Sequence, residues 1–112
     1  MADYKRYITQ IQENGNVMIS DDVVAAIVEH ALTDVEGAAF HGDVKKNWNK
    51  AMKILIAEDN SVSISVNITV TYGHSVVDVA NNVQNVLTAA VENMTGVKVA
   101  NVNINICGIA RQ

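Results

Sequence analysis

The sequence predicts an α+β fold, a two-layer sandwich in which two helices pack on one face of a mixed β-sheet. Two neighbouring stretches predict it. From Val62 to Tyr72 apolar and polar residues alternate strictly, which is typical of a strand with one buried and one polar face. A helix with a broad apolar stripe follows between Ser75 and Gly96, and a Val/Ile-rich strand comes next. Such short connections indicate a parallel crossover, and helices that are apolar on one side leave the other face of the sheet open.

The length of 112 residues predicts one domain over residues 1–112, large enough to bury a core without disulfides or a metal. Hydrophobic residues make up 49% of the chain, yet no apolar run approaches the length of a membrane span. The N-terminus lacks the basic-then-apolar order of a signal peptide, and the single cysteine, Cys107, cannot form an internal disulfide, so we expect a cytoplasmic protein. A net charge of −4 argues against nucleic-acid binding, which requires concentrated positive charge.

The N-terminal third is expected to form a hairpin followed by a helix. Apolar residues at Ile8–Ile11 and Val17–Ile19 flank an Asn-Gly turn, which favours a tight hairpin. Ser20 lies at the N-cap position of the helix, and Asp21 and Asp22 in the first turn complement its dipole. The apolar side of this helix consists of Val24, Ile27, Val28, Ala31, Leu32 and Val35.

Short strands are expected in the middle of the chain. Gly37 lets the chain turn into a short strand at Ala38–Phe40. The polar and least regular segment, His41–Asn49, leads into the alternating apolar residues of Met52–Ile56. The polar turn Glu58–Asn60 then makes a second hairpin with the long strand.

The C-terminal third contains the second helix and the last strand. Ser75 and Asp78 have the spacing of a capping box. The helix stripe consists of Val76, Val79, Ala80, Val83, Val86, Leu87, Ala90, Val91 and Met94. Apolar residues of the last strand change parity between Val99 and Val102, which predicts a β-bulge near Ala100–Asn101. The expected core contains Ile27, Ala31, Ile64, Val66, Ile68, Val83, Leu87, Val91, Val102 and Ile104.

The residue types most often used in catalysis form no recognisable motif. His30, His41 and His74 lack the spacing of a zinc-binding helix, and Cys107 has no basic neighbour in the sequence that would activate its thiol. The glycines are scattered singly, so the sequence contains no phosphate-binding loop. We therefore assign no catalytic residue, cofactor, metal or small-molecule substrate. A small enzyme whose site is assembled across the fold stays open as an alternative.

Positive charge gathers around the single tryptophan, because Lys45, Lys46, Lys50 and Lys53 flank Trp48. One interpretation is a contact site for an anionic partner, either lipid headgroups or an acidic protein. The other interpretation, which we favour, is an edge strand protected by lysines against pairing with another edge.

The polar face of the second helix carries Asn81, Asn82 and Asn85. Exposed helix faces are usually rich in Lys and Glu, which favour helix more than Asn does. A protein contact at this face and a plain solvated face are both open.

Short segments across nearly the whole chain follow the order found in one known family. They are Gly15–Val24, Val35–Gly37, Val70–Gly73, Val83–Gln84 and Thr95–Ile104. With these segments the sequence resembles the alkaline shock protein family, general-stress or envelope-stress proteins of Gram-positive bacteria. The resemblance implies a small, non-enzymatic cytoplasmic protein tied to stress or envelope homeostasis, with no catalytic residue to carry over.

We expect the protein to act through self-association or a protein partner in envelope and alkaline stress. A partner associated with the membrane would place the protein at the membrane periphery. The alternative from another class is an RNA-binding α+β module. The predicted open sheet face lacks the aromatic residues on which bases stack, which argues against that alternative.

Overall fold

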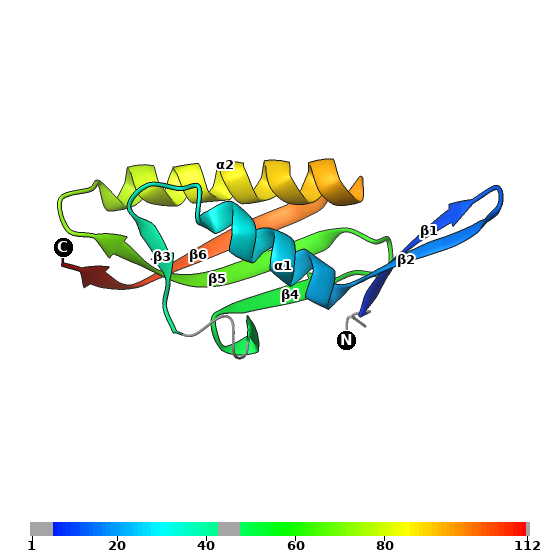
Figure 1. Cartoon of the computed structure of the whole chain (residues 1–112), viewed down its shortest axis with the longest axis horizontal. Helices are drawn as coiled ribbons and strands as arrows, with labels where there is room; N and C mark the ends of the chain where they lie inside the picture. Colours follow the sequence, from blue (N-terminus) through cyan, green and yellow to red (C-terminus); the bar gives the residue numbers. More distant parts are fainter. Residues whose placement is uncertain (1–5, 43–47, 112) are drawn as a thin grey trace.

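A four-stranded sheet covered by two helices forms the two layers that the sequence predicts (Figure 1). The computed structural model describes residues 6–42 and 48–111. Along this part of the chain the elements are β1 (Tyr7–Gln12), β2 (Gly15–Ser20), α1 (Asp21–Leu32), β3 (Ala38–Phe40), a 3₁₀ turn (Trp48–Lys50), β4 (Met52–Ile56), β5 (Val62–Thr71), α2 (Val76–Thr95) and β6 (Val99–Ala110).

Strand β5 is the centre of the sheet. It pairs in parallel with β6 along its whole length, as the crossover through α2 predicts. It pairs antiparallel with β4 over Val62–Val66 and with β3 over Ile68–Val70. Because β6 occupies one edge of β5, β3 and β4 share the other edge one after the other. One edge of this sheet is therefore β6, and the other edge is formed by β4 and β3 in succession.

The predicted bulge in the last strand is confirmed. Val62 and Ser63 of β5 pair with Val99 and Asn101, so Ala100 is the extra residue. A second shift, which the sequence analysis missed, leaves Cys107 outside the register between Ile68 and Thr69. Each bulge adds one residue to β6, and the apolar side chains of β6 therefore lie on the helix side of the sheet both before and after it.

The core lies between the sheet and the helices. Helix α1 packs against α2 and β4, and α2 packs against β6. The alternating residues of β5 from Val62 to Val70 are fully buried, as are Val83, Leu87 and Val91 of α2. Of the predicted core, Ile104 alone is wrong, because it is only half-buried. The reason is its place on an edge strand, where no strand covers its outer side.

The two predicted helix starts differ in detail. Ser75 caps α2 as predicted, since its Oγ accepts a hydrogen bond from the Asp78 N–H at 3.3 Å. Ser20 has the N-cap position of α1, but its side chain makes no capping hydrogen bond. Instead the Asp21 N–H donates to the Arg6 carbonyl at 2.8 Å. A backbone carbonyl of the hairpin thus binds the first N–H of the helix.

Strands β1 and β2 form the predicted hairpin, which extends away from the two layers (Figure 1). Asn60 fixes its root. The side-chain amide of Asn60 donates to the Thr9 carbonyl at 3.0 Å and accepts from the Thr9 N–H at 3.3 Å. The side-chain amide of Gln10, the residue after Thr9, donates to the Thr95 carbonyl at the end of α2. The hairpin is therefore oriented by two amide side chains, while Ile11 near its tip is 86% exposed.

Candidate interaction surface

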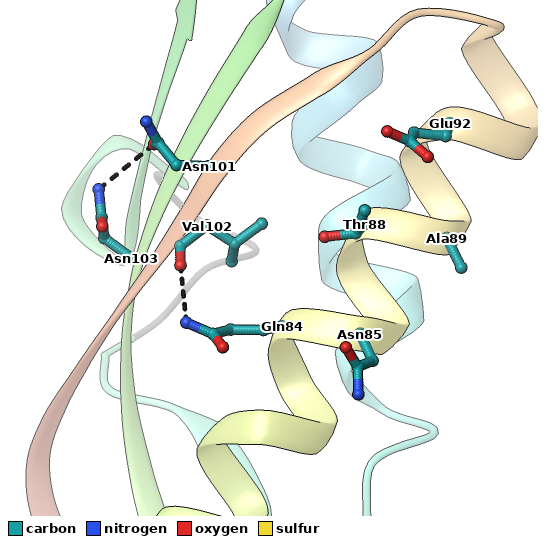
Figure 2. Close-up of a pocket in the computed structure, with 8 residues that line it drawn as sticks. All are labelled: Gln84, Asn85, Thr88, Ala89, Glu92, Asn101, Val102 and Asn103. Atoms are coloured by element: carbon teal, nitrogen blue, oxygen red, sulfur yellow. Dashed lines mark hydrogen bonds between the residues drawn. The ribbon is translucent and has the colours of Figure 1, made fainter.

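A groove open to solvent runs between α2 and the outer edge of β6, with a volume of about 600 Å³ (Figure 2). We call it the α2–β6 groove. It is lined by Gln84, Asn85, Thr88, Ala89, Glu92, Asn101, Val102 and Asn103. Glu92 is the one charged residue among them, and the others are amides, a hydroxyl and small apolar side chains.

Two side chains of α2 bind backbone groups on the outer edge of β6. The Gln84 amide donates to the Val102 carbonyl at 3.1 Å. The Glu92 carboxylate accepts from the Val99 N–H at 3.0 Å. Gln84 and Glu92 lie two helical turns apart, so they point to the same side of α2. The helix therefore satisfies the first part of the β6 edge and forms one wall of the groove.

The open face of the sheet is polar and uncharged over β5 and β6. From Ser63 to Thr71, β5 places serine, asparagine and threonine there, and β6 adds Asn101, Asn103 and Asn105. The side-chain amide of Asn105 donates to the side-chain oxygen Oδ1 of Asn67 at 3.0 Å, which links the two strands. No aromatic side chain from the described part of these two strands lies on this face, so β5 and β6 themselves offer no ring on which a nucleic-acid base could stack.

The three asparagines singled out in the sequence are all exposed on α2. Asn85 lines the α2–β6 groove, whereas Asn81 and Asn82 do not. Asn81 precedes Asn85 by four residues, so it lies on the same side of the helix, one turn nearer its N-terminus. The hydrogen bonds of the neighbouring Gln84 and Glu92 could not be predicted from the sequence, since they depend on where β6 packs.

Of the residues around the tryptophan, the structure describes Trp48, Lys50 and Lys53. Lys45 and Lys46 lie outside the described residues. Trp48 begins a 3₁₀ turn rather than continuing β4, and it is half-buried against the core. Lys50 and Lys53 are exposed, and Lys53 lies on the edge strand β4.

The indole of Trp48 also has a polar partner far away in the sequence. Its Nε1–H donates to Asp22 Oδ1, in the first turn of α1, at 2.8 Å. The ring is thus held by packing and by this hydrogen bond, in contact with a carboxylate rather than directed into solvent.

We expect the fluorescence of Trp48, the single indole of the chain, to stay unchanged when anionic vesicles are added at low salt. The packed and hydrogen-bonded ring should emit at short wavelength and be poorly quenched. Asp22→Ala removes the acceptor of the indole N–H, so a change in emission in that variant would show that the readout responds. A vesicle-induced shift that disappears with added salt would instead establish the contact site for an anionic partner.

The three histidines and Cys107 do not come together in one site. Within residues 6–42 and 48–111, no group of three or more His, Cys, Asp or Glu side chains could hold a metal ion. Cys107 is exposed at the second bulge of β6. The ring of His74 lies close to Gly37, which places it at the turn after β5.

A second groove, of about 380 Å³, lies between the two helices and is mostly apolar. The apolar residues that line it include Val23, Ile27, Ala31, Ala90 and Met94. Met94 belongs to the apolar stripe that the sequence predicts for α2, and in the structure its side chain is 71% exposed. The stripe is wider than the surface that the sheet and α1 cover, so its last member stays at the rim.

No helix of the described chain combines the length with the apolar character that crossing a bilayer requires.

Comparison with known proteins gives a family and two uncharacterised relatives. The model of the alkaline shock protein 23 family, described as having a cell envelope-related function, matches residues 9–111. The uncharacterized protein YqhY of Bacillus subtilis is 32% identical over 105 residues, which cover 85% of this chain and 77% of that protein. The uncharacterized protein Spy1535 of Streptococcus pyogenes serotype M6 is 30% identical over 105 residues, covering 88% of this chain and 81% of that protein. No solved structure matches the chain.

Proposed function

The chain belongs to the alkaline shock protein 23 family, and on that premise we propose that it serves envelope homeostasis under stress without catalysis, through protein contacts at the α2–β6 groove. In this proposal the protein works in the cytoplasm. It reaches the membrane periphery only through a partner.

The composition of the α2–β6 groove is the observation that carries the proposal. General acid–base or nucleophilic catalysis needs a reactive group with a second group within hydrogen-bonding reach. The one carboxylate of the groove, Glu92, already accepts a hydrogen bond from the Val99 N–H. The remaining lining offers amides and a hydroxyl, which suit hydrogen bonds to a polypeptide.

Family membership supports the envelope part of the proposal, because the family is described by a cell envelope-related function. The amides on α2 support the protein-contact part. Asn81 and Asn85 lie in line beside the groove and are exposed, and an amide is less costly to desolvate than a charged side chain.

The proposal is tested by capturing partners in the native cell. The tagged full chain is cross-linked during alkaline or cell-wall stress, purified, and the bound proteins are identified by mass spectrometry. We expect Asn85→Arg, which fills the groove with a charged side chain, to abolish a specific set of captured proteins. Asn93→Arg is the matched control, because Asn93 is exposed on α2 but does not line the groove.

The genetic arm of the test uses the same two variants. Cells lacking the protein should become sensitive to envelope stress, Asn93→Arg should restore growth, and Asn85→Arg should not. Equal capture and equal growth with both variants would show that the groove is not the contact surface.

A further inference from the structure

Strand β6 is an edge strand with an unusual composition. It has 12 residues, none of them charged, and the charges Lys98 and Arg111 stand just beyond its ends. Within the described chain it pairs with β5 alone. A long, uncharged and unpaired edge is a template for the addition of another strand, and most soluble proteins interrupt such edges with charges.

The hydrogen bonds to α2 show which backbone groups face outward. Val99 and Val102 are bound from outside the sheet by Glu92 and Gln84. Outward and inward groups alternate along a strand, so Ile104 and Ile106 also direct their N–H and C=O groups outward. In the described chain α2 supplies no partner for these two residues, and both side chains are only half-buried.

We infer that a second copy of this chain adds its β6 antiparallel to this edge, with the two-fold axis at Asn105. Ile104 then lies opposite Ile106 of the second copy, and each such pair exchanges both of its N–H···O=C bonds. Opposed residues share a face, so the isoleucines cover one another on the helix side, and the two Asn105 amides meet on the open face. The inference rests on the proposed function and names the partner at the same surface.

Charge and helix placement also fit a second copy. With each bulge counted as one position, Arg111 of the second copy comes opposite Val99, whose N–H is bound by the Glu92 carboxylate. Beside the edge, α2 presents Val77, Asn81 and Asn85 at four-residue spacing, and all three are exposed. Because these three side chains are uncharged, they do not repel the same three side chains of the second α2. A two-fold axis relates the two copies, so the assembly closes as a dimer.

The first test measures the mass of the full chain by sedimentation across a concentration series. We expect a monomer–dimer equilibrium for the native chain. Asn105→Lys places two like charges opposite each other at the axis and should weaken dimerisation by about tenfold or more, whereas Asn93→Lys, exposed on α2 outside the α2–β6 groove, should change it little. Asn105→Glu alone should also weaken it, and mixing Asn105→Lys with Asn105→Glu should restore the dimer.

The second test locates the axis chemically. At a non-hydrogen-bonded antiparallel pair the Cα atoms lie about 4.5 Å apart, which a disulfide can span. Asn105→Cys in a Cys107→Ser background should therefore form a disulfide-linked dimer on mild oxidation, and Asn101→Cys in the same background should not. A strict monomer at high concentration, or a dimer that responds equally to both sites, would overturn the β6 pairing. Partner capture that still depends on Asn85 would then leave the proposed function standing.

Discussion

Leu87→Ala is expected to lower the free energy of unfolding by roughly 2–5 kcal/mol. Leu87 is fully buried in the middle of α2, facing the sheet. Truncation removes its apolar surface from the core and leaves a cavity that the rigid sheet beneath cannot close. Urea unfolding at one fixed protein concentration, followed by circular dichroism, measures the effect.

The matched control is Asn82→Ala on the exposed face of the same helix, which should stay within about 0.5 kcal/mol of the native protein. A loss below about 0.5 kcal/mol for Leu87→Ala as well would mean that α2 does not pack on the sheet through this residue.

Gly37→Ala is expected to have the second-largest effect, because it combines backbone strain with a steric clash. Gly37 has φ +86°, a conformation in which an alanine is strained by about 1–3 kcal/mol. An added Cβ would also lie 2.9 Å from Cγ and Nδ1 of the His74 ring. That distance forces the ring or the backbone to move, so the loss of stability should exceed the strain alone.

Gly73→Ala separates the two contributions. Gly73 has φ +102°, but an added Cβ would meet no atom within 4 Å, so only the backbone strain applies. Gly37→Ala should therefore unfold at a lower urea concentration than Gly73→Ala. Adding His74→Ala to Gly37→Ala should recover part of the lost stability. Equal unfolding midpoints for the two glycine variants would argue against the clash.

The elements that the sequence predicts well are those with long, regular periodicity. The two-residue period of β5 and the broad stripe of α2 each extend over many residues, so local errors do not change the interpretation. The parity change between Val99 and Val102 likewise predicts the first bulge, because burial forces the register. The second bulge was not predicted, because Cys107 and Gly108 are neither clearly apolar nor clearly polar and so do not show a change of parity.

The candidate surface was predictable only in part. The asparagines of α2 stand out by composition, and Asn85 does line the α2–β6 groove. The hydrogen bonds of Gln84 and Glu92 to β6 could not be predicted, because they depend on how far the helix reaches over the edge of the sheet. The same holds for Trp48, whose partner Asp22 is 26 residues away and meets it only after α1 packs.

The extra residues of β6 bear on how this chain can change its length during evolution. Twelve residues of β6 match the ten of β5, because Ala100 and Cys107 stand outside the regular pairing. Deleting Ala100 would leave every later side chain on its present face. Deleting a residue between the two bulges would transfer one part of the strand to the opposite face and expose its isoleucines. Insertions and deletions in descendants of this sequence should therefore gather at the two bulges and spare the stretch between them.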